Sequence, residues 1–151
     1  MNEYNYKSIS LYSSKKETLY AIPTGLSYNF NMEVDIDILN ILEMPYSDKD
    51  IEDLFFSTFA QCFSKAVEGD LGSAPLAKHF GAKTYAASVR NLKYLYLFWT
   101  KNEGYAITPT CKIPRKGYVH LEEKTKILGF DPKPGEVAAA IRQAIEESTT
   151  Y

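Results

Sequence analysis

Carboxylates are concentrated in one part of this sequence. Eight acidic residues fall between positions 33 and 53, where Lys49 is the one basic residue. Such a density creates a negative field that attracts a positively charged partner and speeds its association. We therefore expect a protein-binding surface here, made by seven of these residues: Glu33, Asp35, Asp37, Asp48, Asp50, Glu52 and Asp53.

The histidines offer a weaker case for chemistry. His120 is expected in a strand with Glu122 on the same face, and a histidine beside a carboxylate could transfer protons. A polar pair on a sheet surface is the commoner reason for such spacing. The two cysteines and two histidines show none of the paired spacings of a zinc site, and the glycine-rich phosphate motifs are absent. We expect no enzyme, no metal and no cofactor.

A second function remains open, because basic and aromatic residues gather later in the chain. Aromatic side chains beside cations can bind single-stranded nucleic acid by stacking and by phosphate contacts. The basic residues are Lys112, Arg115, Lys116, Lys124 and Lys126, and the aromatic ones are Tyr94, Tyr96 and Phe98. The net charge of −2 disfavours a general nucleic-acid coat.

Length and composition predict one soluble domain. A chain of 151 residues with 45% hydrophobic and 24% charged residues has ordinary globular composition and needs no disulfide to fold. The 12 tyrosines are the unusual feature, since tyrosine suits strands and interfaces alike. The N-terminus lacks the pattern of a secretion signal, and no apolar run is long enough to span a bilayer. We expect a protein of the reducing cytoplasm.

The first three carboxylates belong to a predicted strand. From Tyr28 to Ile38 the even positions are apolar and the odd positions are polar, which is the period of a strand with one face on a core. Glu33, Asp35 and Asp37 then extend into solvent about 6.6 Å apart. The residues 23–25, Pro-Thr-Gly, are expected to end the preceding strand.

The other four carboxylates belong to a predicted helix over residues 48–67. Ser47 is a suitable N-cap, and Asp48 and Asp50 stand in the first turn, where the helix dipole favours anions. Apolar residues then repeat at helical spacing until a glycine ends the pattern. A second helix is predicted over residues 135–148, with a narrow alanine-rich apolar face.

The most apolar stretch predicts the first strand of a hairpin. Residues 91–100, NLKYLYLFWT, carry apolar side chains on both faces, and a polar turn with a glycine joins them to a second apolar run. Such a strand lies in the middle of a sheet and is covered on both sides. Further strands are expected over 4–12, 18–22, 117–123 and 124–128.

The order of these elements predicts the α+β class. We expect a single domain over residues 1–151, with an antiparallel sheet on which one long central helix (about 48–67) and a C-terminal helix (about 135–148) pack. Between them, Ser73 could cap a short helix that ends near Gly81. Residues 84–90 fit either a helix or a strand.

The C-terminal third carries a Thr108-Pro109 element at a strand end, a glycine-containing strand, and an acidic, small-residue helix from Glu136 to Glu147. In these features the sequence from Tyr105 to Ser148 resembles the end of the CdiI family of contact-dependent growth inhibition immunity proteins. The rest of the chain is similar to that family only in length and order.

The resemblance implies a binding protein. Members of this family lie in the cytoplasm and block a toxin domain, often a nuclease, that a neighbouring bacterium delivers. Because interface residues vary with the toxin, none is transferred to this chain. The expectation of an acidic interface follows from the residues themselves, since a nuclease active site is typically basic.

Overall fold

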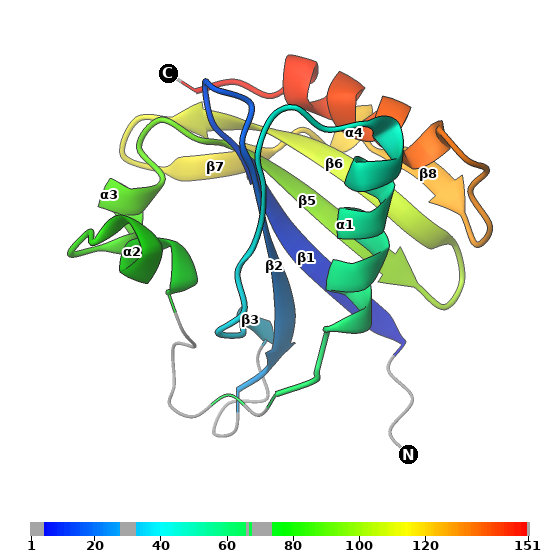
Figure 1. Cartoon of the computed structure of the whole chain (residues 1–151), viewed down its shortest axis with the longest axis horizontal. Helices are drawn as coiled ribbons and strands as arrows, with labels where there is room; N and C mark the ends of the chain where they lie inside the picture. Colours follow the sequence, from blue (N-terminus) through cyan, green and yellow to red (C-terminus); the bar gives the residue numbers. More distant parts are fainter. Residues whose placement is uncertain (1–4, 28–32, 66, 68–73, 151) are drawn as a thin grey trace.

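The chain folds into a curled antiparallel sheet with helices packed on it, in the computed structural model of Figure 1. The structure describes residues 5–27, 33–65, 67 and 74–150. In chain order the elements are β1 Tyr6–Ser13, β2 Leu19–Leu26, β3 Glu33–Asp35, β4 Asn40–Leu42, α1 Asp48–Ala60, α2 Pro75–Phe80, α3 Tyr85–Ser88, β5 Lys93–Thr100, β6 Gly104–Ile113, β7 Gly117–His120, a 3-10 turn Glu122–Lys124, β8 Lys126–Gly129 and α4 Glu136–Glu147.

The described strands form one sheet in the order β3-β2-β1-β5-β6-β7. β4 also pairs with β2, and β8 also pairs with β6. Two short strands, β3 and β4, therefore pair with different parts of β2, and β7 and β8 pair with different parts of β6. β3 pairs with the end of β2, at Thr24–Leu26, whereas β4 pairs with its beginning, at Leu19–Ala21. The segment from β3 to β4 therefore runs back along β2.

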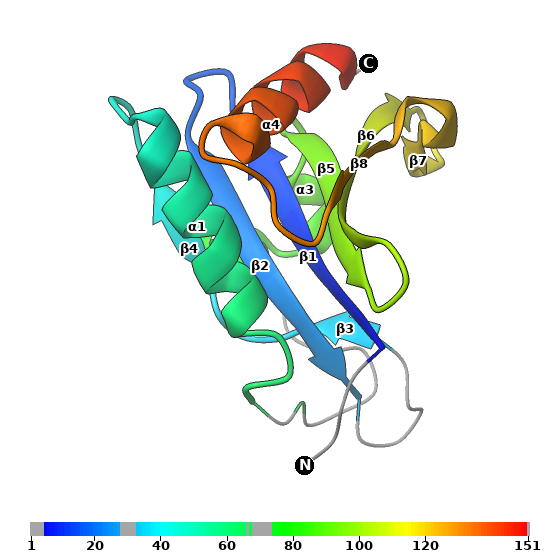
Figure 2. The same ribbon diagram turned by 90° about the vertical axis from the view of Figure 1, so that its right-hand side faces the viewer.

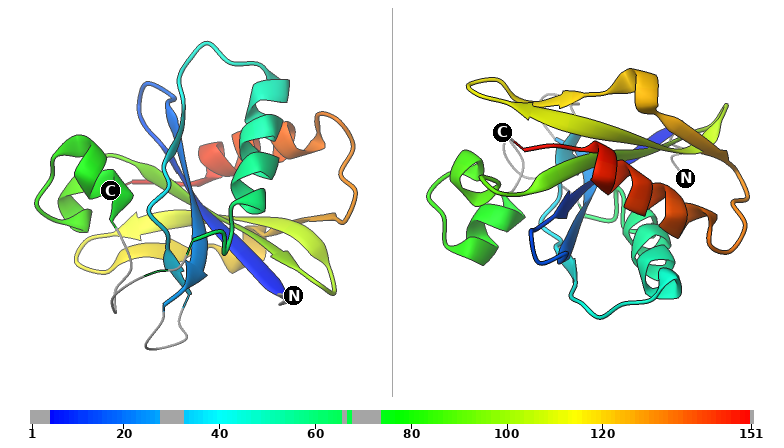
Figure 3. Two further views of the ribbon diagram at one scale, coloured as in Figure 1. Left: turned by 60° about the horizontal axis from the view of Figure 1, so that its bottom comes forward. Right: turned by 90° about the horizontal axis from the view of Figure 1, so that it is seen from above.

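Two helices, α1 and α4, cover one face of the sheet and lie side by side (Figure 2). The short helices α2 and α3 stand apart from them at one end (Figures 1 and 3). Alternate residues of the central strands supply the core beneath α1 and α4, as the period of two requires. The fully buried members of this core include Ile9, Leu11, Leu95 and Leu97 from the strands, and Ile51, Phe55 and Ile141 from the helices.

The other face of the sheet, which we call the open face, carries the alternate residues of the same strands. It holds Ser8, Ser10 and Tyr12 of β1 and Tyr94, Tyr96 and Phe98 of β5. The predicted hairpin is confirmed, and β5 does lie mid-sheet between β1 and β6. The two faces of β5 are not equally covered, however. Leu95 and Leu97 on one face are fully buried, while Tyr94, Tyr96 and Phe98 on the other are only half-buried.

The long central helix predicted over residues 48–67 is wrong, because α1 has 13 residues and ends at Ala60. Three residues later the backbone of Phe63 takes a positive φ of 62° and its N–H donates to the carbonyl of Thr24, 3.0 Å away in β2. The chain thus leaves the helix to follow the sheet, and Val67 forms a bridge with Ser27. The apolar spacing persists past Ala60 because these residues still face the core.

Of the other predicted elements, the structure confirms the C-terminal helix and corrects the expected end of β2. The C-terminal helix is confirmed, with bounds Glu136–Glu147, and residues 84–90 contain the short helix α3. β2 continues through Pro23 to Leu26, which corrects the expected break, since the carbonyl of Pro23 accepts a hydrogen bond from Ile36. Residues 28–32 of the predicted alternating strand, and the proposed cap Ser73, lie outside the described residues.

None of the helices in the described part of the chain combines the length and the apolar character needed to cross a membrane.

Candidate functional site

The structure divides the seven predicted interface carboxylates into two groups. Glu33, Asp35 and Asp37 lie in or beside β3, at the end of β2. The four in α1 lie near the beginning of β2, where the Tyr46 hydroxyl donates to the carbonyl of Glu17 at 2.7 Å. Figure 1 shows the start of α1 and the strand β3 at opposite ends of the molecule. Closeness in sequence therefore does not produce one continuous acidic surface.

Three of the α1 carboxylates make local surface interactions. Asp50 completes a capping box with Ser47, and Asp53 pairs with Lys49 at 2.9 Å. Asp48 pairs with Arg142 of α4 at 3.1 Å. Exposed pairs of this kind contribute little to stability, so these residues stay available to a partner.

Glu52 has a structural role that its position in the sequence does not indicate. Its carboxylate accepts hydrogen bonds from the backbone N–H of Gly135, at 3.0 Å, and of Ala138, at 3.1 Å. These are free donors at the start of α4, where the helix dipole also favours a negative charge. Gly135, the N-cap, makes no side-chain cap of its own. Glu52 therefore caps α4 and joins it to α1.

Glu52→Gln is expected to lower the free energy of unfolding by about 1 kcal/mol, because one carboxylate oxygen is replaced by an amide that cannot accept from these N–H groups. Urea-induced unfolding measures the change. Asp53→Asn is the matched control and should change stability by less than about 0.5 kcal/mol, since it removes only an exposed ion pair. Equal effects of the two variants would contradict the capping role.

The β3 carboxylates have a different environment. Glu33 and Asp37 are exposed, and Asp37 pairs with Lys78 at 2.9 Å. Asp35 is half-buried and accepts a hydrogen bond of 3.4 Å from the Ser10 hydroxyl. Burial raises the pKa of Asp35 to about 6, against a smaller lowering effect of the Ser10 hydrogen bond. Partial desolvation also raises the pKa of the more exposed Glu33. The expectation that Asp35 extends into solvent is therefore wrong.

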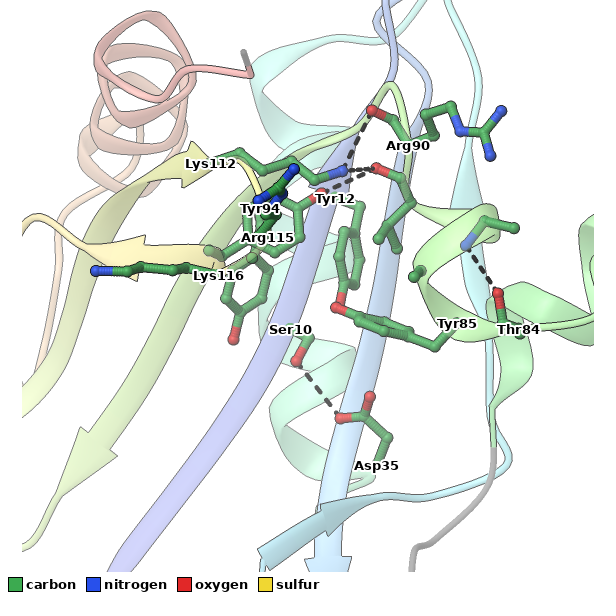
Figure 4. Close-up of a pocket in the computed structure, with 15 residues that line it drawn as sticks. Ser10, Tyr12, Asp35, Thr84, Tyr85, Arg90, Tyr94, Lys112, Arg115 and Lys116 are labelled. Carbon is green, nitrogen blue, oxygen red and sulfur yellow. Dashed lines mark hydrogen bonds between the residues drawn. The ribbon is translucent and has the colours of Figure 1, made fainter.

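Asp35 lies in a groove on the open face, which consists of two adjoining hollows of about 860 and 560 Å³. Both hollows are lined by Ser10, Asp35, Tyr85 and Tyr94. Figure 4 shows the larger one, with Asp35 at the β3 end and Tyr85 on α3 facing β1. The residues shared by both hollows come from four elements far apart in the sequence, β1, β3, α3 and β5.

Tyrosines form the walls of the groove. The hydroxyls of Tyr12 and Tyr85 are 2.6 Å apart, and the Tyr94 ring lies 5.1 Å from the rings of both Tyr12 and Tyr118. Burial raises the pKa of Tyr12 and Tyr94, and raises that of Tyr96 to about 12. These phenols therefore stay neutral at physiological pH, and the half-buried Tyr94 and Tyr96 line the groove, whereas Tyr12 is buried.

The far end of the larger hollow is basic. Arg90, Lys112, Arg115 and Lys116 line it, and Figure 4 places them away from Asp35. The Lys112 amine donates to the carbonyls of Val89, at 2.8 Å, and Arg90, at 3.2 Å, and lies over the Tyr118 ring. The groove therefore has carboxylates at one end and cations at the other.

The basic cluster predicted from the sequence is divided. Only its first three members, Lys112, Arg115 and Lys116, reach the groove. Lys124 lies 4.0 Å from Glu147 of α4, and Lys126 is exposed on β8.

The histidine considered for catalysis packs on an aromatic residue. The His120 ring stacks on Tyr96 with centroids 4.8 Å apart. β7 ends at His120 and Glu122 lies in the following 3-10 turn, so the expectation of both residues on one strand face is wrong. Among the residues that the structure describes there is also no group of three or more histidine, cysteine, aspartate or glutamate side chains placed to hold a metal ion.

Comparisons with known proteins inform the fold alone. No protein-family model matches the chain, and no curated protein matches it. Among solved structures, the chain is similar to a protein of unknown function, NMB0488, from Neisseria meningitidis, with a TM-score of 0.70 and 14% sequence identity over 98% of each chain. The two proteins share an architecture over nearly their whole length.

Proposed function

We propose that this chain is a cytoplasmic immunity protein that binds a toxin domain of a contact-dependent growth inhibition system and neutralises it by covering its active site. The observation that supports the proposal is the groove on the open face, where Glu33 and Asp35 lie beside Tyr85, Tyr94 and Tyr96. Aromatic side chains supply much of the binding free energy at protein interfaces. Carboxylates attract a basic partner and speed its association.

The partner that fits this surface is a basic protein domain, such as a nuclease. The resemblance of the C-terminal third to the CdiI family supports the toxin class. The interface is centred on the β3 carboxylates, because they lie next to aromatic contact area. The α1 carboxylates Asp48, Asp50 and Asp53, at the other end of β2, form a second surface whose participation the experiments below separate from the first.

The direct test uses the toxin domain that the proposal requires. The probe is the C-terminal domain of a large secreted protein encoded next to the gene for this chain. Co-expression of this chain should restore growth of cells that produce the domain, and the two proteins should purify as a one-to-one complex. Absence of both protection and complex would overturn the proposal.

The charge-reversed variant Glu33→Lys/Asp37→Lys is expected to slow association with that domain at least tenfold and to weaken its salt dependence, since steering depends on opposite charges. Both residues are exposed, so the fold should be retained. Stopped-flow mixing at several salt concentrations measures the rate.

Two further variants carry the same change in charge. Asp48→Lys/Asp53→Lys tests the α1 surface, and Glu103→Lys/Glu123→Lys tests exposed carboxylates outside both groups. A β3 variant that associates no more slowly than the Glu103/Glu123 control would remove the β3 carboxylates from the interface. A larger effect of the α1 variant would move the interface to α1.

Single-stranded nucleic-acid binding remains the second candidate. The Phe98 ring stacks with Tyr96 at 5.4 Å and with Tyr6 at 6.2 Å, which gives the open face a row of half-buried rings. Glu33 and Asp35 lie beside Tyr96 in the smaller hollow and would repel a phosphate backbone there. The geometry therefore favours a protein partner, and a gel shift with single-stranded oligonucleotides at physiological salt distinguishes the two.

A further inference from the structure

The smaller hollow of the groove has a chemically distinct lining. It combines two carboxylates, three hydroxyl-bearing side chains, three tyrosine rings and two small apolar residues. They are Glu33, Asp35, Ser8, Ser10, Thr24, Tyr85, Tyr94, Tyr96, Val34 and Ala74. Among these described lining residues there is no lysine, arginine or histidine. The hollow is therefore negative, rich in hydrogen-bond acceptors and walled by aromatic rings.

This combination suits a planar cation. A guanidinium group offers five N–H donors in one plane, pairs with a carboxylate through two parallel hydrogen bonds, and stacks on aromatic faces. Asp35 supplies the carboxylate, and Tyr85 and Tyr94 supply ring faces on the same hollow. The hydroxyls of Ser8 and Thr24 also line this hollow, but they are buried and hydrogen-bonded to each other at 3.0 Å, so Asp35 is the main acceptor for a guanidinium.

The rest of the groove limits how much positive charge can enter. The larger hollow continues from Asp35 toward Arg90, Lys112, Arg115 and Lys116. A run of basic residues along the groove would meet like charges at that end, which is unfavourable. A partner segment with one basic side chain at the Asp35 end, followed by neutral or acidic residues toward the basic end, would be complementary in charge to both ends of the groove.

We infer that the smaller hollow receives one arginine side chain of a protein partner, with its guanidinium between the Asp35 carboxylate and the tyrosine rings. The identity of that partner as a toxin rests on the proposed function. The recognition chemistry itself depends only on the groove.

The test is a titration of the isotope-labelled full chain followed by NMR, with N-acetyl-arginine methylamide as the probe. Its matched control is N-acetyl-citrulline methylamide, which has a similar shape and no charge. The arginine probe should shift the backbone signals of the residues that line the smaller hollow. It should bind at least tenfold more tightly than the citrulline probe, because a charge-assisted hydrogen bond contributes more than a neutral one.

Asp35→Asn should weaken binding of the arginine probe about tenfold, whereas Glu103→Gln, which removes an exposed carboxylate in the β5–β6 turn, should leave it unchanged. Glu33→Gln provides a second test at an exposed position and should weaken binding less. Equal binding of the two probes, signal changes outside the hollow, or unaltered affinity in Asp35→Asn would each overturn the inference.

The two proposals fail in different ways. If the chain protects cells and binds the toxin domain but does not distinguish the two probes, only the arginine site is wrong. If the arginine probe binds selectively but the chain neither binds nor neutralises the toxin domain, the site stands and the toxin is the wrong partner.

Discussion

Gly104→Ala is expected to lower the free energy of unfolding by about 4 kcal/mol, because the new methyl group combines backbone strain with a steric clash. Gly104 has a φ of 77°, which side chains other than glycine rarely adopt. A Cβ atom there would lie 2.4 Å from the backbone carbon and oxygen of Gly129 in β8. Those atoms cannot rotate away as a side chain could. Urea-induced unfolding measures the loss.

The control is Gly117→Ala at the start of β7. Gly117 has a φ of 82°, and a Cβ atom there would meet nothing within 4 Å. It therefore carries the backbone strain without the clash, and should cost about 1 kcal/mol. If the two substitutions cost the same, the close approach of β8 to the β5–β6 turn would not determine the stability of this region.

That β5–β6 turn also shows what the sequence could predict. Two apolar runs joined by a short turn ending at Gly104 identified the hairpin, because hairpin pairing is local and its turn needs a residue with positive φ. The helix α4 was recognisable for the same reason, since its apolar spacing lies within one continuous segment.

The end of α1 was not predictable from spacing. Helical and irregular segments can present the same apolar residues to a core. In this chain, contacts with residues distant in sequence determine where the helix ends. Asn40 in β4 donates a 2.7 Å hydrogen bond to the side chain of Gln61, the residue that follows α1, and Phe63 pairs with Thr24 in β2. Such tertiary contacts override local helix preference.

The groove could not be predicted from the sequence for a related reason, since contacts between distant segments form it. The period of two correctly placed Ile36 in the core and Asp35 on the other face, but it assumed that solvent covers that face. Instead α3 brings Tyr85 against Tyr12, which is 73 positions earlier. The twelve tyrosines of the sequence were the one available signal, and they do not indicate which of them meet.

The acidic surface illustrates the limit of counting charges along a chain. β3 and α1 are neighbours in sequence, yet the chain between them runs back along β2, and their carboxylates end at opposite ends of that strand. Glu52 is then used to cap α4, and Asp35 lies within the groove. The fold is therefore needed to distinguish carboxylates exposed to a partner from carboxylates, such as Glu52, that cap a helix.

Asp35→Asn is expected to raise the free energy of unfolding by about 2 kcal/mol near pH 7.5. The pKa of Asp35 is raised from 3.8 in the unfolded chain to about 6 in the folded protein, chiefly by burial. The ionised carboxylate therefore opposes folding above pH 6, and this penalty disappears as the pH falls from about 6 toward 4. An asparagine at this position can still accept the Ser10 hydrogen bond but carries no charge.

The measurement is the difference in unfolding free energy between the variant and the original chain at several pH values, in which the titration of groups elsewhere cancels. Among the described residues, the titratable groups that line the hollows near Asp35 are Glu33, whose pKa is also raised, and the phenols of Tyr12, Tyr85, Tyr94 and Tyr96. The cations Arg90, Lys112, Arg115 and Lys116 line the far end of the larger hollow. The stabilising effect should be largest above pH 7 and absent near pH 4. A constant difference across this range would show that burial does not act on the Asp35 charge.

A stabilising substitution at Asp35 would carry a functional meaning. Most substitutions destabilise a protein, and those that stabilise it often remove a group that activity or binding requires. In the half-buried hollow, burial raises the pKa of Asp35, so its charge opposes folding above pH 6. The same variant should lose affinity for the arginine probe, so gain of stability and loss of binding would come from one carboxylate. That opposition is expected of a binding residue and not of a structural one.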